Sequence, residues 1–317
     1  MNTAATTSGA PGPGRKLKLL TIVLVLFFLL IGFFIANAVN PVGTQREYLQ
    51  IAGWWYDHWP LSHGGSIFYR VNDRFYALGI MKPVQVKLPS GINMELDGRD
   101  LVTQTILTQG IWEAQETAFI TNNLRPGDVF VDVGAHVGYY SLLAAKLVGE
   151  TGKVIAVEPN PPTIVRLEKD IALNPFQNIL VQKVACTEAE TTMKFYQAPL
   201  ENTGESSMNK ANAKEGTEIT VRGVPLDKIV QDLGIKRVDV VKIDVEGAEM
   251  SVLGGMTNII AAYHPKFAVE LKDDLLKNMG SSLAAAKALF IRNGYTLQAF
   301  DGIDNFYWVP APQPAAR

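Results

Sequence analysis

Cysteine is nearly absent from this sequence, since Cys186 is its one cysteine among 317 residues. A single thiol excludes an intrachain disulfide framework and any structural zinc site built on two or more cysteines. The chain also lacks an excess of positive charge, because 29 Lys and Arg residues stand against 31 Asp and Glu residues. Proteins that bind a nucleic-acid backbone need a basic surface. The sequence therefore predicts no nucleic-acid partner.

Charged residues are scarce and apolar residues are abundant, at 19% and 47% of the chain. This composition is typical of a folded globular protein and excludes a largely disordered or fibrous one. A length of 317 residues suits one large domain or two small ones, and it is sufficient to bury a core.

Charge is missing altogether from Leu19–Val39, a run of 21 mostly apolar residues. As a helix this run would be about 30 Å long, which matches the hydrocarbon thickness of a bilayer. A cleaved signal peptide is the alternative, because Ala36-Asn37-Ala38 has the form of a cleavage site. The apolar run up to Ile35 is longer than the core of a signal peptide. We therefore expect an uncleaved transmembrane helix, preceded by a disordered basic leader at residues 1–18.

The orientation of this single-pass anchor is less well determined. Arg15, Lys16 and Lys18 precede the apolar run, and basic residues on one flank favour a cytoplasmic N-terminus. With one span, the chain after Val39 would then lie on the far side of the membrane. The sequence thus predicts a membrane location but leaves open which side the rest of the chain faces.

A segment rich in aromatic residues, 40–105, forms an N-terminal extension. Trp54, Trp55, Tyr56 and Trp59 could stack on a sugar, but ordinary packing or contact with a membrane surface explains them better. Later in the segment, two short stretches alternate apolar and polar residues around Pro89-Ser90-Gly91, which predicts a β-hairpin.

Short apolar strands alternate with helices through the main domain, which we place at residues 106–317. This alternation predicts an α/β fold with a mostly parallel sheet covered on both faces. The expected strands are Val129–Val133, Lys153–Glu158, Ile179–Val184, Val238–Asp244, Pro265–Leu271, Thr296–Phe300 and Asn305–Val309. The expected helices are Thr103–Asn123, interrupted at Gly110, Tyr139–Val148, Thr163–Leu173, Leu226–Asp232, Ala248–Ile260 and Leu283–Asn293. The polar stretch Thr187–Arg222 predicts an inserted loop or short antiparallel strands.

The first two strands end in a pattern that predicts a nucleoside site, because ligands bind beyond the carboxyl ends of parallel strands. Gly134 and Gly138 allow a sharp turn and a close approach of the backbone to a ligand. The helix that begins near Tyr139 directs free N–H groups toward the same place. Glu158, at the end of the next strand, is placed to accept hydrogen bonds from two ribose hydroxyls.

The details of this pattern favour S-adenosylmethionine over a dinucleotide. A dinucleotide fingerprint needs a middle glycine that leaves room for a pyrophosphate, and His136 occupies that position. The carboxylate of Asp132 suits a ligand with a positive amino group and would repel a phosphate. S-adenosylmethionine has an amino-acid tail and no phosphate, so we expect it as the cofactor.

A second group of acids follows the strand that ends at Asp244. Glu246 and Glu249 are three residues apart and would share one helical face if the helix begins near Glu246. Acids in a first helical turn can simply favour the helix dipole, but this explains an acid at a strand end less well. An alcohol that accepts a methyl group must lose its proton. We expect Asp244 to be the base, with Glu246, Glu249 and His264 as alternatives. The clustered carboxylates could also bind Mg²⁺, although the sequence does not require a metal ion.

At these positions the sequence resembles the FkbM-type S-adenosylmethionine-dependent methyltransferases. The resemblance covers about Gly110 to Asn293. Its segments are Val131-Asp132-Val133-Gly134-Ala135, Val157-Glu158-Pro159-Asn160-Pro161 and, most specifically, Lys242-Ile243-Asp244-Val245-Glu246-Gly247-Ala248-Glu249. It implies a class I Rossmann-like methyltransferase fold with a mostly parallel seven-stranded sheet, preceded here by the transmembrane helix. It also implies O-methylation of a hydroxyl on a sugar, a glycan or another natural product.

The resemblance also implies cofactor-binding residues. They are Asp132, Gly134 and Gly138 at the methionine end, Glu158 at the ribose with Asn160 after it, and Ala185 and Cys186 at the adenine. Asp244 would border the reacting methyl group, and Glu113 matches an acid that the family carries near the cofactor. His136 stands where the family more often has Asn, so the role of its side chain stays open.

Two other classes of function are compatible with the sequence. An NAD-dependent oxidoreductase would bind nicotinamide, which the missing middle glycine at His136 opposes. A membrane-tethered binding protein could keep the fold without turnover, although the intact set of Asp132, Glu158 and Asp244 favours an enzyme. The identity of the acceptor and the oligomeric state are not determined by the sequence.

Overall fold

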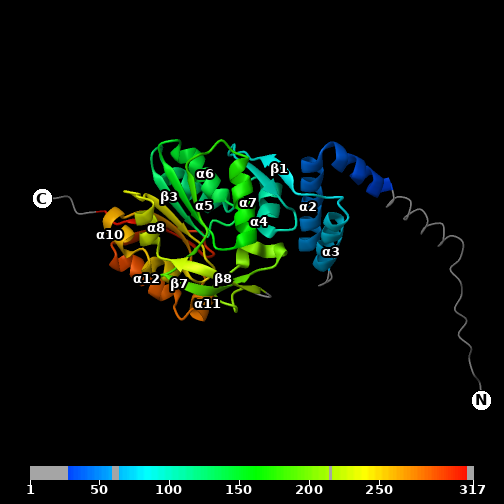
Figure 1. Cartoon of the computed structure of the whole chain (residues 1–317). Helices are drawn as coiled ribbons and strands as arrows, with labels where there is room; N and C mark the ends of the chain where they lie inside the picture. The colour runs from blue at the N-terminus through cyan, green and yellow to red at the C-terminus, as the bar shows by residue number, and fades with distance from the viewer. Residues whose placement is uncertain (1–27, 59–63, 214–215, 313–317) are drawn as a thin grey trace, which may run out of the picture. The chain divides into compact units, whose positions relative to one another are not determined.

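The computed structural model describes residues 28–58, 64–213 and 216–312 (Figure 1). The chain divides into two compact units, Met1–Val84 and Gln85–Arg317. The division falls at the start of the hairpin segment, ahead of the domain start that we predict at residue 106.

The described part of the first unit is helical. A helix over residues 28–39 is followed by α2 (Pro41–His58) and α3 (Gly64–Ala77). The ring of Phe33 stacks on Phe75 at a centroid distance of 5.4 Å, and Tyr48 packs against both rings at 5.7 Å. Aromatic contacts of this kind contribute about 0.5–1.5 kcal/mol each beyond the burial of their area. They hold the three helices together.

Several predictions for the N-terminal region fall outside the described residues. These are the leader at residues 1–18, the first part of Leu19–Val39, and the side chains of the aromatic cluster from Trp54 to Trp59. Within the ranges that the structure describes, no helix combines the length and the apolar character needed to cross a membrane.

The second unit is built on a seven-stranded sheet, as the sequence predicts. Its strands are β3 (Val129–Val133), β4 (Lys153–Val157), β5 (Ile179–Gln182), β9 (Val240–Ile243), β10 (Lys266–Glu270), β11 (Tyr295–Phe300) and β12 (Asn305–Pro310). They lie in the order β11-β12-β10-β9-β3-β4-β5, and β12 alone runs antiparallel to its neighbours. The carboxyl ends of β3, β4, β9 and β10 therefore meet at one edge of the sheet.

Helices cover both faces of this sheet (Figure 1). They are α4 (Leu101–Gln109), α5 (Ala114–Asn123), α6 (Tyr139–Val148), α7 (Pro161–Ala172), α8 (Leu226–Asp232), α9 (Glu249–Gly254), α10 (Thr257–Tyr263), α11 (Asp273–Asn278) and α12 (Leu283–Arg292). One apolar core joins Val131, Ile243 and Phe267 of the sheet to helices α8, α9, α10 and α12. On the opposite face, Ala156 packs against Leu167 of α7. Burial on both faces explains why β3 and β9 are apolar apart from Asp132 and Lys242.

Two smaller sheets complete the unit. β1 (Val84–Lys87) and β2 (Asn93–Leu96) form the predicted hairpin. In the polar stretch, β7 (Thr191–Gln197) and β8 (Thr217–Val224) pair antiparallel, and β6 (Ala185–Cys186) pairs parallel to β8. Of the two alternatives for this stretch, short antiparallel strands are therefore correct. A short 3-10 helix, η1 (Leu200–Glu205), lies between β7 and β8.

Two expected helices are broken by glycine. The segment Thr103–Asn123 forms α4 and α5, because α4 ends at Gly110 with φ of +79°. The segment Ala248–Ile260 forms α9 and α10, and the break falls at Gly255, where a Cβ would lie 2.1 Å from the carbonyl oxygen of Thr187. Since α9 begins at Glu249, Glu246 lies outside the helix, and the condition under which the two acids would share a helical face is not met.

Gly134 fixes how closely the ends of β3 and β9 approach each other. It has φ of +82°, and a Cβ at this position would lie 1.8 Å from the backbone oxygen of Asp244. We expect Gly134→Ala to lower the free energy of unfolding by roughly 3 kcal/mol, because backbone strain and the clash add together. Gly294→Ala is the matched control, with φ of +79° but open space around it, and should cost about 1 kcal/mol. Urea unfolding followed by circular dichroism compares the two, and equal losses would contradict the close contact.

Candidate active site

A cavity of about 360 Å³ opens at the sheet edge where β3, β4, β9 and β10 end. Most of the residues that we predict from the sequence line it, namely Glu113, Gly134, His136, Glu158, Ala185, Cys186, Asp244 and Glu246. The cavity walls do not include Asp132, Gly138, Asn160 or Glu249. Its walls also include Lys242, Glu270, Lys272 and the η1 residues Asn202 and Thr203, to which the sequence assigns no role.

The turn after β3 contributes Gly134 and His136 to the cavity wall and has an unusual backbone conformation. Gly134, His136 and Gly138 all have positive φ, at +82°, +51° and +90°. A Cβ at Gly138 would lie 2.4 Å from a methyl group of Leu167, so only glycine fits beneath α7. The non-glycine residue His136 is strained there, and such strain persists only where surrounding contacts enforce it.

Glu158 is the carboxylate that organises this turn. One oxygen accepts a hydrogen bond from the backbone N–H of His136 at 2.9 Å, and the other accepts from that of Asn160 at 2.9 Å. Burial raises the pKa of Glu158 to about 7, although these two N–H groups oppose the shift. Asn160 lies behind the cavity, where its side chain bonds Gln197 and Ser206.

A buried lysine, Lys242, neutralises two of the predicted acids. Its ammonium group lies 3.1 Å from Asp244 and 3.9 Å from Asp132, and it donates to the carbonyl oxygen of Gly134 at 3.1 Å. Asp132 is fully buried, accepts a bond from Ser141 and has one oxygen without a hydrogen-bond partner. Burial acts to raise the pKa of Asp244, but Lys242 and then Lys272 outweigh it, so this pKa is lowered. Asp132 thus faces the lysine, not the cavity.

Two further acids lie beside Lys242. Glu113 lines the cavity with φ of +37°, and the hydroxyl of Tyr140 donates to it at 3.0 Å. Glu116 is 2% exposed, and burial raises its pKa well above the usual range, which favours its neutral form. The sequence did not predict Glu116 as a site residue, because an acid in the first turn of a helix is explained by the helix dipole alone.

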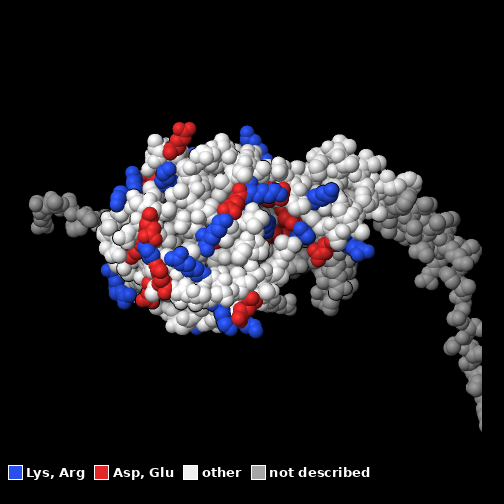
Figure 2. Space-filling model, in the orientation of Figure 1, with Lys and Arg blue, Asp and Glu red and all other residues white. Residues whose placement is uncertain are grey.

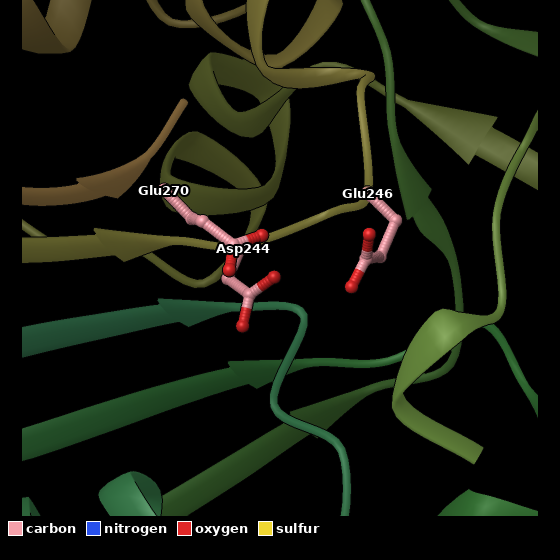
Figure 3. A group of neighbouring side chains, drawn as sticks. All are labelled: Asp244, Glu246 and Glu270. Atoms are coloured by element: carbon pink, nitrogen blue, oxygen red, sulfur yellow. The ribbon is translucent and has the colours of Figure 1, made fainter. Parts of the chain in front are cut away.

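Three carboxylates gather where β9 and β10 end (Figure 3). The oxygens of Asp244, Glu246 and Glu270 lie within 4.8 Å of one another. Carboxylates at this spacing could share a divalent cation. Here the chain supplies the positive charge itself, since Lys272 lies 2.9 Å from Glu270 and 3.4 Å from Glu246. We therefore assign no metal ion to this group.

Glu249 and Cys186, two further predicted site residues, have structural surroundings that do not suit a reactive group. Glu249 is 1% exposed, and one of its oxygens accepts from the backbone N–H of Gly247 at 3.0 Å. Its carboxylate therefore holds the turn ahead of α9. Cys186 lines the cavity with Ala185, and burial raises the pKa of its thiol to about 12, which keeps the thiol neutral and unreactive.

The η1 helix forms a wall of the cavity through a hydrogen-bonded chain. The ring of His136 lies 2.6 Å from the hydroxyl of Thr203, which donates to Asp100, and Arg166 bonds Asp100 at 2.8 Å. Because the Thr203 hydroxyl proton goes to Asp100, the Nε2 of His136 must be the donor. Burial lowers the pKa of His136 to about 4, even though Asp100 opposes the shift. The histidine is therefore neutral at physiological pH.

These features agree with what the chain resembles. Residues 132–297 match the Methyltransferase FkbM domain, so the chain belongs to this family. Hexuronic acid methyltransferase AglP of Haloferax volcanii is 29% identical over 133 residues, which cover 42% of this chain and 52% of that protein. AMB antimetabolite synthetase AmbE of Pseudomonas aeruginosa is 26% identical over 242 residues, which cover 65% of this chain and 11% of that protein.

The chain thus spans about half of the length of the first of these curated relatives and about a tenth of the length of the second. Among solved structures, the chain is similar to an FkbM methyltransferase from Methylobacillus flagellatus KT. That similarity has a TM-score of 0.39 and 17% sequence identity, and it covers 66% of this chain and 52% of the other.

The depressed pKa of His136 predicts a dependence of stability on pH. Between its folded pKa of about 4 and its unfolded pKa of 6.5, the unfolded chain binds the extra proton, so stability falls as pH falls through this window. We expect His136→Asn to weaken that fall by up to about 1.4 kcal/mol per pH unit. Urea unfolding at several pH values measures it, with exposed His264→Asn as the control. Parallel pH profiles for wild type and His136→Asn would contradict the burial of a neutral imidazole.

Proposed function

We propose that this chain is an S-adenosylmethionine-dependent methyltransferase that methylates a hydroxyl oxygen of a sugar, a glycan or another natural product. The observation that carries the proposal is Glu158, whose carboxylate is fixed by two backbone N–H groups beside the open turn at Gly134. Membership of the FkbM methyltransferase domain family supports the same conclusion.

The residues present fit this cofactor. Each oxygen of Glu158 accepts one backbone bond and keeps a lone pair for a ribose hydroxyl. The missing Cβ of Gly134 leaves the backbone bare at the cavity wall. Acids outnumber lysines among the lining residues by six to two, which suits a cationic ligand. When bound, S-adenosylmethionine supplies an electrophilic methyl group on a positively charged sulfur.

Individual residues then have separate tasks. Glu158 would bind the ribose, and Ala185 and Cys186 would border the base. Glu113 and Asp244 line the side of the cavity nearest Lys242, where they would face the charged end of the cofactor. Asp132 would act indirectly, by holding Lys242.

The acceptor is proposed to be a hydroxyl compound. A relative that is 29% identical over part of its length is named a hexuronic acid methyltransferase, which favours a sugar. A hydroxyl also needs a base, and two of the expected acids, Asp244 and Glu246, line the cavity. Glu249 is turned toward the backbone of Gly247 and is a poorer candidate.

Two simple measurements distinguish the proposed function from its two rivals. An oxidoreductase would bind NAD, yet His136 places a side chain where a pyrophosphate needs a glycine. A non-catalytic binding protein would bind S-adenosylmethionine without transferring the methyl group. Calorimetry with S-adenosylmethionine and with NAD tests the first rival. Transfer of a labelled methyl group to a panel of sugars and glycans tests the second.

Glu158 provides the sharpest test of cofactor binding. We expect Glu158→Gln to weaken binding of S-adenosylmethionine roughly 10- to 100-fold, because hydrogen bonds to a charged group are lost. In wild type, binding should weaken as pH falls below about 7, where Glu158 takes up a proton, and the variant should lose this dependence. Exposed Glu168→Gln, which pairs with Lys183, is the control for titration calorimetry. Unchanged affinity in Glu158→Gln would remove the main support for the proposal.

The apolar run Leu19–Val39 supports a further proposal, attachment of the chain to a membrane. In the described helix over residues 28–39, Phe28, Leu29 and Ile35 are 67%, 65% and 62% exposed. Exposed apolar side chains gathered in this way mark contact with a membrane or another protein. Which side of the membrane the cavity would face stays open.

Membrane attachment is tested by fractionation of cells that express the full chain. We expect wild type to stay with the membrane pellet after an alkaline wash. Leu26→Arg combined with Leu29→Arg should release a large share of it, because each arginine costs about 3 kcal/mol near the centre of a span. Ile303→Arg, at an exposed position of the second unit, is the control. Wild-type protein in the wash supernatant would contradict the proposal.

A further inference from the structure

Glu246, Lys272 and Glu270 form one group at the end of the cavity opposite Glu158. Glu158 follows β4 and Glu270 ends β10, and these strands are three inter-strand spacings apart. At about 4.8 Å per spacing, their ends are separated by roughly 14 Å. A cofactor that reaches from Glu158 to Asp244 therefore leaves the β10 side of the cavity for the acceptor.

The backbone at Glu246 is held in a conformation that few residues adopt. Its φ is +52°, in the left-handed region that costs a non-glycine residue energy. Two side chains from the segment between β7 and β8 maintain it, because Ser207 and Asn212 both donate to the carbonyl oxygen of Glu246 at 2.8 and 2.9 Å. Gly247 then permits the turn, since a Cβ there would lie 2.5 Å from Asn212.

This strained turn directs the carboxylate of Glu246 into the cavity. Figure 3 shows it reaching from the loop toward Asp244 and Glu270, which stand at the strand ends. Both oxygens of Glu246 lie near the ammonium group of Lys272, at 3.4 and 3.5 Å. Lys272 also contacts Glu270 at 2.9 Å, so one lysine holds the two glutamates side by side.

Asp244, in contrast, already forms an ion pair with Lys242. Lys242 lies 3.1 Å from its carboxylate and is itself almost fully buried. Loss of this ion pair would leave an uncompensated buried charge, which is costly. Lys242 and Lys272 together lower the pKa of Asp244 against the effect of burial, which makes it the weaker base.

We propose that Glu246 is the catalytic base toward the acceptor hydroxyl, and that Lys272 and Glu270 are positioning residues that hold it. This inference rests on the proposed function. As the acceptor oxygen bonds to the methyl carbon, the bond from that carbon to sulfur breaks and the sulfur keeps the electron pair. The hydroxyl proton passes to an oxygen of Glu246, so the charge of the sulfonium and that of the carboxylate are both neutralised.

The charges around Glu246 agree with this role. Burial and then Asp244 raise its pKa to about 7, while Lys272 opposes them and Glu249 adds a smaller upward effect. Burial, Asp244 and Glu246 also raise the pKa of Glu270, well above its usual value. At neutral pH, Glu246 is thus ionised in part and basic enough to take a proton.

The first experiment needs no acceptor and no cofactor. The full chain is labelled with ¹³C at glutamate carboxyls, and the resonance that Glu246→Gln removes is followed by NMR against pH. We expect a midpoint near 7, an upward move in Lys272→Met because its cation is lost, and no move in Lys277→Met, an exposed lysine paired with Asp273. A midpoint near the ordinary 4.5, or one that Lys272→Met leaves unchanged, would overturn the assignment.

The second experiment measures turnover on an acceptor found by the labelled-methyl screen. We expect Glu246→Gln to lower kcat by about 100-fold or more, while the Kd for S-adenosylhomocysteine changes less than about twofold. Lys272→Met should move the pH profile of kcat upward, together with the NMR midpoint. Residual activity of Glu246→Gln near that of wild type would overturn the proposal, as would Mg²⁺ binding by the free protein that Glu246→Gln abolishes. Failure to bind S-adenosylhomocysteine would refute the proposed function instead.

Discussion

The arrangement of the cavity depends on one buried cation, the ammonium group of Lys242. It projects from β9 between Asp132 and Asp244 and bonds the carbonyl oxygen of Gly134. Without this charge, carboxylates from two neighbouring strands would repel one another in a medium of low polarity, where such repulsion is strong. Lys242 therefore allows β3 and β9 to end side by side with acids at both tips, and it fixes the turn at Gly134 between them.

Charge around the cavity is balanced in two different ways. Near β3 and β9, Lys242 is surrounded by acids, and burial raises the pKa of Glu116, which favours its uncharged form. Near β10, Lys272 lies between Glu246 and Glu270, whose pKa values are also raised. On the face seen in Figure 2, by contrast, acidic and basic side chains are interspersed. The acids thus gather where a cationic ligand would gain most from them.

The segment between β7 and β8 joins the two ends of the cavity. Thr203 of η1 bonds His136 in the turn after β3, while Ser207 and Asn212 bond the backbone of Glu246 after β9. A polar insertion that resembles a plain loop in the sequence therefore holds residues at both the proposed cofactor end and the proposed acceptor end. A shift of this segment would move both sets of contacts together.

The sequence by itself determined the sheet, most of its strands and helices, and the residues at the strand ends. Apolar runs, glycines and acids at fixed places are local signals, and the strand tips Gly134, Glu158 and Asp244 follow from them. The sequence could not determine which acids are neutral, paired or free, because that depends on distances between strands far apart in the chain. Lys242 and Lys272 became site residues only once β9 and β10 lay beside β3. Glu249 proved to be a turn residue, because its carboxylate accepts from the backbone N–H of Gly247 ahead of α9.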